Sequence, residues 1–189
     1  MAEVLLFHHA LGLTPGVRGF ADELRAAGHT VHTPDLYEGR TFTDIPTGVD
    51  HARSIGFENV IARGRDVASL LRPNLVYLGM SLGVMPAQTL AMTRRGAKGG
   101  VFLYGCLPLS EFGGVWPAGV GLQIHVMEGD EDGDLEFARD AAATVDGSQL
   151  FLYPGDRHLF ADSSVPDQYD AGAAALMTRR VLEFLEKVA

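Results

Sequence analysis

A serine stands between two glycines in the segment Gly79-Met80-Ser81-Leu82-Gly83, which fits the pattern G-x-S-x-G. An apolar run over residues 75–78 precedes this segment and a helical pattern follows it, which is the setting of a nucleophilic serine on a tight strand-to-helix turn. The glycines would leave room where neighbouring backbone passes close to the turn. We therefore expect Ser81 to be a catalytic nucleophile, and a plain glycine-rich turn is the alternative.

A nucleophilic serine needs a base, and the chain offers seven histidines: His8, His9, His29, His32, His51, His125 and His158. In chains with this serine motif the acid and the histidine follow the serine, in that order. Only His125 and His158 come after Ser81, and His125 falls within an apolar run that predicts a strand. His158 follows the last expected strand in a loop, where a rigid scaffold commonly holds reactive side chains. We expect His158 to be the base.

The acid that orients His158 is expected just after the strand over residues 122–126. The segment Glu128-Gly129-Asp130-Glu131-Asp132-Gly133-Asp134 follows it, and the residues alone leave several of its carboxylates open as the acid. Its spacing also fits the start of a calcium-binding loop, but Leu135 and Ala141 stand where that loop needs Gly and Glu. No His and Cys residues have the spacing of a zinc site. We expect neither a metal nor another cofactor.

Short apolar runs alternate with helical patterns along the whole chain. We expect strands over residues 4–7, 30–33, 75–78, 101–104, 122–126 and 149–153. We expect helices over residues 16–27, 57–71, 82–94, 135–145 and 171–187. This alternation predicts an α/β fold whose mostly parallel central sheet is flanked by helices on both faces. Residues 37–56 and 106–121 are expected to be loops, and loops beyond strand ends build the site of such a sheet.

The length of 189 residues fits one domain spanning residues 1–189. The chain has 15 Lys+Arg and 24 Asp+Glu and no basic cluster, which argues against nucleic acid or an anionic membrane as a partner. The single Cys106 cannot form an internal disulfide, and we expect it to be a small buried hydrophobe. The sequence shows neither a signal-peptide pattern nor a membrane-spanning apolar run. We expect a cytoplasmic protein that acts on a small molecule.

The order of these motifs resembles that of the dienelactone hydrolase family of the α/β-hydrolase superfamily, over nearly the whole chain. The segments that carry the resemblance are residues 8–13 (HHALGL), 27–29 (AGH), 34–37 (PDLY), 79–83 (GMSLG), 129–132 (GDED) and 153–160 (YPGDRHLF). The resemblance implies a single-domain α/β-hydrolase that cleaves esters or lactones without a cofactor.

The resemblance also implies roles for individual residues. The nucleophile of the family falls on Ser81 and its base on His158. Its acid follows a G-x-x-D pattern, which falls on Asp132, with Asp130 as the close competitor. The best-known members carry Cys as the nucleophile, so the serine here is a departure. The basic residues that bind the substrate carboxylate in those members have no counterpart that we can match.

Three further positions follow from the resemblance. The backbone N–H groups of Leu82 and Ala10 would form the oxyanion hole, and His9 stands where the best-known members have a glutamate. The sequence thus predicts a serine hydrolase that cleaves a small ester or lactone through a Ser-His-Asp triad and an acyl-enzyme intermediate. Acyl transfer or thioester cleavage on the same triad is an alternative, as is a non-catalytic α/β binding module. The oligomeric state is not predicted.

Overall fold

The computed structural model describes residues 1–189 and contains one six-stranded parallel sheet with the strand order β2-β1-β3-β4-β5-β6. The strands are β1 (Glu3–Phe7), β2 (Thr30–His32), β3 (Val76–Met80), β4 (Gly99–Leu103), β5 (Gly121–Met127) and β6 (Gln149–Tyr153). The chain moves outward from β1 to β2, returns past β1 to β3 and continues in the opposite direction to β6. Because the order reverses between β1 and β3, the carboxyl ends of these two strands are where such a sheet binds its ligand.

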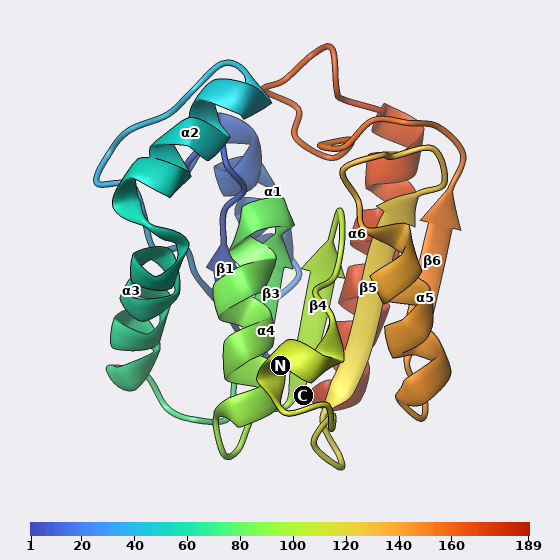
Figure 1. Ribbon diagram of the computed structural model, residues 1–189. Helices are drawn as coiled ribbons and strands as arrows, with labels where there is room; N and C mark the ends of the chain where they lie inside the picture. Colours follow the sequence, from blue (N-terminus) through green and yellow to red (C-terminus); the bar gives the residue numbers. More distant parts are fainter.

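Six helices cover the two faces of the sheet (Figure 1). They are α1 (Pro15–Ala26), α2 (Ile45–Ile55), α3 (Phe57–Ser69), α4 (Val84–Thr93), α5 (Leu135–Thr144) and α6 (Ala171–Val188), with short 3₁₀ helices at Ser81–Gly83 and Leu109–Phe112. Side chains of α1 and α6 pack on one face, and those of α2, α3, α4 and α5 pack on the other. The expected parallel sheet with helices on both faces is confirmed. None of the helices is both long and apolar enough to cross a membrane.

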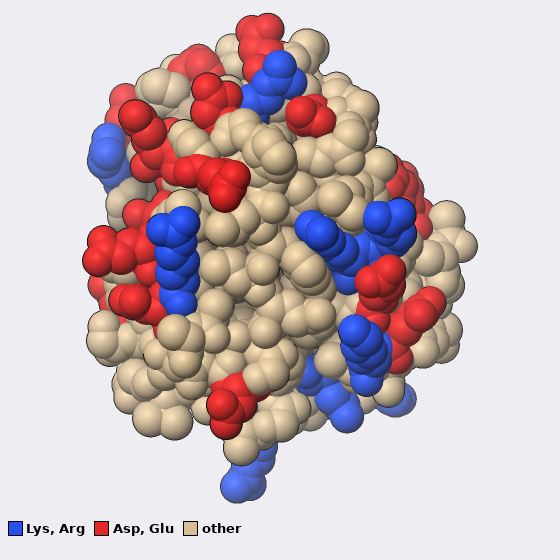
Figure 2. Space-filling view, turned by 90° about the vertical axis from the view of Figure 1, so that its right-hand side faces the viewer, with Lys and Arg blue, Asp and Glu red and all other residues tan.

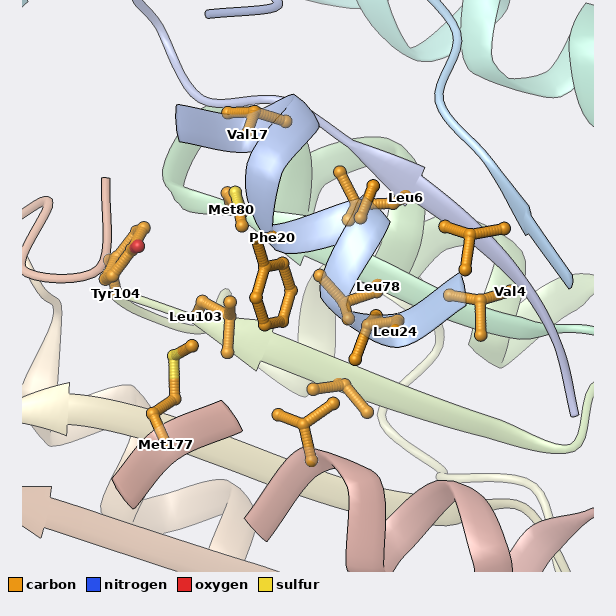
Figure 3. Packing of buried hydrophobic residues seen from close by; sticks show 14 of the residues in the cluster. Val4, Leu6, Val17, Phe20, Leu24, Leu78, Met80, Leu103, Tyr104 and Met177 are labelled. Atoms are coloured by element: carbon orange, nitrogen blue, oxygen red, sulfur yellow. The ribbon is translucent and has the colours of Figure 1, made fainter. Parts of the chain in front are cut away.

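In every strand except the short edge strand β2, alternate side chains enter two separate hydrophobic clusters. In β1, Val4 and Leu6 pack with α1 and α6, whereas Leu5 and Phe7 pack with the helices of the other face. Figure 3 shows the first cluster, in which side chains of α1 and α6 meet those of β1, β3 and β4. Burial on both faces explains why β1, β3 and β4 are runs of consecutive apolar residues, whereas β5 alternates because Gln123 and His125 lie between its apolar residues.

The expectation that residues 37–56 form a loop is wrong, because α2 occupies Ile45–Ile55. Asp44 caps its first turn by accepting a hydrogen bond from the Thr47 N–H at 2.9 Å. Ile45, Val49, Ala52 and Ile55 do recur at helical steps of four and three residues, but Pro46 and Gly48 interrupt this short pattern and are typical of loops.

A close backbone contact joins α2 to the segment after β1. A Cβ atom on Gly48 would lie 2.3 Å from the Ala10 carbonyl oxygen, so only glycine allows this approach. The contact brings α2 over the carboxyl end of β1, at the edge of the sheet where a ligand is expected.

Two histidines, His125 in β5 and His8 directly after β1, are buried and hydrogen-bonded on both ring nitrogens. In β5, His125 bonds the Tyr153 hydroxyl at 2.7 Å and the Gln123 amide oxygen at 2.9 Å, which confirms a structural histidine there. His8 accepts a hydrogen bond from the Leu36 N–H at 3.0 Å through Nε2. Burial lowers the pKa of His125 to about 3 and that of His8 to about 4. Both rings are therefore neutral in the folded protein at neutral pH.

We expect the free energy of unfolding to fall as the pH drops from about 6.5 to about 5. In the unfolded chain both histidines take up protons in this range, whereas in the folded protein they stay neutral until about pH 4 and about pH 3. Each histidine should therefore contribute a slope that approaches about 1.4 kcal/mol per pH unit. Urea unfolding at several pH values measures this slope. A His125→Gln variant should lose the contribution of one histidine, and an unchanged slope would contradict the assignment.

Candidate active site

Ser81 lies on a sharp turn between β3 and α4. β3 ends at Met80, a 3₁₀ turn spans Ser81–Gly83, and α4 begins at Val84. The φ angle of Ser81 is +49°, in the left-handed region that a residue with a side chain adopts only at a cost in free energy. A strained serine on a strand-to-helix turn is the geometry that exposes a nucleophilic hydroxyl at the edge of a sheet.

The two glycines of the motif allow this turn to pack against neighbouring backbone. A Cβ atom on Gly79 would lie 2.4 Å from the Gly83 carbonyl oxygen, and one on Gly83 would lie 2.3 Å from the Phe7 carbonyl oxygen. Any other residue at either position would force the turn apart or push it away from β1. The expectation that these glycines provide clearance is confirmed.

His158 lies in the loop after β6 and meets Ser81 at the carboxyl edge of the sheet. Its Nε2 lies 2.7 Å from the Ser81 Oγ, and its Nδ1 lies 2.7 Å from the Asp130 Oδ2. Because a carboxylate only accepts hydrogen bonds, Nδ1 carries the ring proton and Nε2 is free to accept from the Ser81 hydroxyl. Side chains from three separate loops thus form one chain of hydrogen bonds.

The carboxylate at His158 belongs to Asp130, and the expectation that Asp132 occupies this place is wrong. Asp130 is buried, with 7% of its surface exposed, whereas Asp132 is exposed. The Asp132 N–H donates to the Asp130 Oδ1 at 3.1 Å. Asp132 therefore supports the buried carboxylate through its backbone.

The turn after β5 decides which aspartate faces inward. The Asp130 N–H donates to the Met127 carbonyl oxygen at 3.2 Å and closes a tight turn at the strand end. The Gly129 N–H donates to the Gly155 carbonyl oxygen at 2.8 Å, which ties this turn to the loop after β6. At Gly133 a Cβ atom would lie 2.7 Å from the Asp130 Oδ2, so this glycine leaves room for the carboxylate. These contacts join distant parts of the chain and do not follow from spacing.

Ala10 and Leu82, the residues expected to form an oxyanion hole, both line the cleft at Ser81. Ala10 follows β1 and is buried, and its N–H donates to no acceptor within the protein. Leu82 comes directly after Ser81, in the turn that leads into α4. Backbone N–H groups beside a nucleophile are the groups that bind a developing negative charge on oxygen.

The cleft beside Ser81 has a volume of about 210 Å³ and a mostly apolar lining. Apolar side chains come from several elements: Val49 of α2, Phe57 of α3, Val84 and Met85 of α4, and Leu107 of the loop after β4. Val49 was not predicted from the sequence, because Pro46 and Gly48 beside it favour a loop over a helix. This lining suits a small apolar group on one side of a bond that Ser81 attacks.

The charged side chains at the cleft are acidic. Asp132 and Asp134 contribute to its lining, and no Lys or Arg does. Partial burial raises the pKa of the Asp134 carboxyl.

On the face seen in Figure 2, Asp and Glu side chains gather toward the left and top, and Lys and Arg form no continuous basic surface. The structure places no group of three or more His, Cys, Asp or Glu side chains where they could bind a metal ion.

A buried glutamine, Gln88 of α4, holds the wall of the cleft that follows β4. Its Nε2 donates to the Leu107 carbonyl oxygen at 2.9 Å, and its Oε1 accepts from the Leu107 N–H at 3.0 Å. The sequence could have indicated Gln88, because it is a polar residue within the apolar run of α4.

Cys106 is buried as expected, and it also lines the cleft. Burial raises the pKa of its thiol to about 12, so the thiol stays protonated.

The His9 side chain pairs with Asp162 and forms no hydrogen bond with Ser81, although the resemblance puts it where other members have a glutamate at the nucleophile. Its Nε2 lies 2.7 Å from the Asp162 Oδ2, and both residues are buried. Asp162 was not identified in the sequence, because no local pattern distinguishes an aspartate whose partner lies 153 positions away.

Comparison with known proteins finds a matching family model and several similar solved structures. The model of the dienelactone hydrolase family matches residues 1–189. No curated protein matches the chain by sequence. A dienelactone hydrolase-like promiscuous phosphotriesterase from metagenomic libraries has a TM-score of 0.78 at 15% identity, covering 100% of this chain and 87% of that one. A putative dienelactone hydrolase from Klebsiella pneumoniae subsp. pneumoniae has a TM-score of 0.75 at 19% identity, covering 98% and 87%. A thioesterase domain from the curacin biosynthetic pathway has a TM-score of 0.66 at 17% identity, covering 96% and 90%.

At these identities the solved structures show the fold, and the family model shows the relationship. The strand order, the strained serine turn and the whole-chain match agree with one another. The chain belongs to the dienelactone hydrolase family and is an α/β hydrolase of the kind that cleaves esters or lactones.

Proposed function

We propose that this protein hydrolyses a small, uncharged carboxylic ester or lactone through Ser81, His158 and Asp130, by way of an acyl-enzyme intermediate. The observation that carries the proposal is the chain of hydrogen bonds from Asp130 through His158 to Ser81, each link 2.7 Å long. A nucleophile, its base and the carboxylate that orients the base are in contact before a substrate arrives.

In the first half of the reaction the Ser81 Oγ attacks the carbonyl carbon while His158 Nε2 takes the hydroxyl proton. Asp130 stabilises the imidazolium that forms and keeps the ring in the required tautomer. The N–H groups of Ala10 and Leu82 donate to the oxyanion of the tetrahedral intermediate. Each such donor is typically worth about 2.7–4 kcal/mol in the transition state. The intermediate collapses as His158 protonates the departing alkoxide, which leaves the acyl group on Ser81.

In the second half, water replaces the alcohol as the attacking group. His158 removes a proton from the water, and the resulting tetrahedral intermediate uses the same two N–H donors. Collapse then breaks the bond to Ser81 and returns the proton to its Oγ, so that the carboxylic acid leaves and the enzyme is restored. For a lactone the alcohol and the acid remain in one molecule, and the product is a hydroxy acid.

Covalent labelling is the direct test of this proposal. A fluorophosphonate probe should form an adduct at Ser81 in the native protein, and peptide mapping by mass spectrometry identifies the site. No adduct, or an adduct elsewhere, would favour a non-catalytic binding module or another nucleophile. Turnover of p-nitrophenyl esters of graded chain length and of simple lactones then defines the acyl group. Faster acyl transfer to an added thiol or alcohol than to water would favour an acyltransferase instead.

We expect p-nitrophenyl butyrate to have a higher kcat/KM than mono-p-nitrophenyl succinate, which has the same chain length but carries a carboxylate. Asp132 and Asp134 would repel the anionic ester, and the cleft lining holds no Lys or Arg to bind it. Each repulsion at an exposed edge is worth about 1 kcal/mol or less, so the ratio should be about 5- to 30-fold.

Asp132→Asn and Asp134→Asn together should reduce this ratio, because they remove the repelling charges. An Asp66→Asn variant, in which an exposed charge of α3 is removed, is the control and should leave the ratio unchanged. Equal cleavage of both esters by the native protein would contradict the assignment of an uncharged substrate.

A further inference from the structure

The buried pair of His9 and Asp162 joins the two loops that carry opposite halves of the proposed site. His9 precedes Ala10, whose free N–H lines the cleft. Asp162 lies in the loop after β6, four positions beyond His158 in the sequence. The proposed mechanism uses neither side chain, although both are almost fully buried and only 2.7 Å separates the His9 Nε2 from the Asp162 Oδ2.

The hydrogen bonds of His9 define its tautomer. The Leu11 N–H donates to His9 Nδ1 at 3.3 Å, so this nitrogen carries no proton. The proton is on Nε2, which donates to the Asp162 Oδ2. One neutral ring thus accepts from the backbone just after Ala10 and donates to the loop of His158. Both attachments constrain the ring, and through it the backbone on either side of Ala10.

In the loop after β6, the Asp162 carboxylate accepts several hydrogen bonds. Besides His9, its carboxylate accepts from the Thr14 hydroxyl at 2.6 Å, and from the Ser164 N–H at 2.8 Å and hydroxyl at 2.5 Å. Burial disfavours its charge, but the hydrogen bonds from His9, Ser164 and Thr14 lower the pKa of Asp162 to about 2. At Gly16 a Cβ atom would lie 1.8 Å from the Asp162 Oδ1, so the segment 9–16 packs directly on this carboxylate.

We propose that His9 and Asp162 are positioning residues that hold the Ala10 N–H in place relative to the Ser81–His158 pair. The inference rests on the proposed function, because it concerns an oxyanion donor of that reaction. Neither side chain touches the substrate, and both act through the backbone of Ala10. A donor displaced by about 1 Å can cost about 10²-fold in rate. The pair should therefore affect kcat more than KM, because the oxyanion forms only in the transition state.

Two substitutions of His9 test separately what its two ring nitrogens contribute. In His9→Gln the amide NH₂ can reach the position of Nε2 and still donate to Asp162, whereas in His9→Asn it is too short to do so. We expect His9→Gln to keep kcat within about threefold of the native value, and His9→Asn to lose about 10- to 100-fold with KM nearly unchanged. A trifluoromethyl ketone, which forms an oxyanionic adduct with a serine, should bind more weakly to His9→Asn by a similar factor.

His125→Leu is the matched control, because His125 is equally buried and hydrogen-bonded but lies within β5. It should lower the melting temperature and leave kcat nearly native. The inference is overturned if His9→Asn also lowers only the melting temperature and leaves kcat nearly native. It is likewise overturned if kcat falls tenfold or more in His9→Gln. Should His9→Asn fail to fold, His9→Gln alone decides between these outcomes.

Hydrogen exchange distinguishes failure of this inference from failure of the proposed function. Backbone amides in segments 9–16 and 158–164 should exchange faster in His9→Asn than in His9→Gln, whatever the reaction of the protein is. Labelling of native Ser81 by the fluorophosphonate reports on the reaction independently. Unchanged exchange in both segments would contradict the link between the loops even in an active hydrolase.

Discussion

Replacing Ser81 with alanine should abolish ester hydrolysis, with a fall in kcat of about 10⁶-fold, as found when the serine of a comparable triad is removed. The substitution removes one oxygen, and with it both the nucleophile and the partner of His158 Nε2. The fold should survive, because Ser81 is only half-buried and its backbone strain is imposed by the contacts of Gly79 and Gly83. Turnover of p-nitrophenyl acetate and the melting temperature measure the two effects.

Ser110→Ala is a suitable control for the Ser81 variant. Ser110 is exposed in the 3₁₀ helix Leu109–Phe112, does not line the cleft, and should be dispensable for both activity and stability. Residual activity of Ser81→Ala above a few per cent of the native value would show that another group is the nucleophile. A large drop in its melting temperature would make the activity loss uninformative about chemistry, and fluorophosphonate mapping of the native protein would then identify the nucleophile.

Asp130→Asn should lower kcat by about 10⁴-fold, the effect of the equivalent change in the best-studied triad. The carboxylate accepts the Nδ1 proton of His158 at 2.7 Å, and this leaves Nε2 free to take the proton of Ser81. An amide at this place favours the wrong ring tautomer and cannot stabilise the imidazolium. Steady-state turnover of one substrate at one pH measures the effect, with the melting temperature as a check on folding.

Asp132→Asn is the matched control, since the two aspartates lie in the same turn and differ in where their carboxylates point. For a neutral ester it should change kcat by about twofold or less, as exposed substitutions usually do. Its N–H, which donates to Asp130, is retained. The reverse ranking of the two variants would restore Asp132 as the acid and would mean that the turn rearranges when substrate binds.

The position of the site follows from the strand order as much as from the motifs. β1 and β3 are neighbours although β2 lies between them in the sequence, and the chain leaves them in opposite directions. Ala10 follows one of these strands and Ser81 follows the other, so the proposed oxyanion donor and nucleophile meet at the point where the order reverses. His158 and Asp130 reach the same edge from β6 and β5, because parallel strands end on one side of the sheet.

Features that depend on short stretches of chain could be predicted from the amino-acid sequence alone. The serine turn was predictable because its glycines, its strand and its helix are adjacent in the sequence. The parallel sheet was predictable because the central strands β1, β3 and β4 are buried on both faces and read as runs of consecutive apolar residues. His158 was identified by its place after the last strand, and its contact with Ser81 agrees with that choice.

Features that depend on contacts between distant segments could not be predicted from the sequence and became visible in the folded structure. Asp130 and Asp132 are chemically identical and two positions apart, so spacing alone could not tell which one the turn directs toward His158. The bond from Gly129 to Gly155 and the room left by Gly133 make that choice. α2 was not predicted because Pro46 and Gly48 within its short apolar pattern favour a loop, and its packing depends on a backbone contact with the segment after β1. Asp162 was not predicted because an aspartate is usually exposed. Its burial is favourable only because His9 and Thr14, from the segment between β1 and α1, donate hydrogen bonds to it.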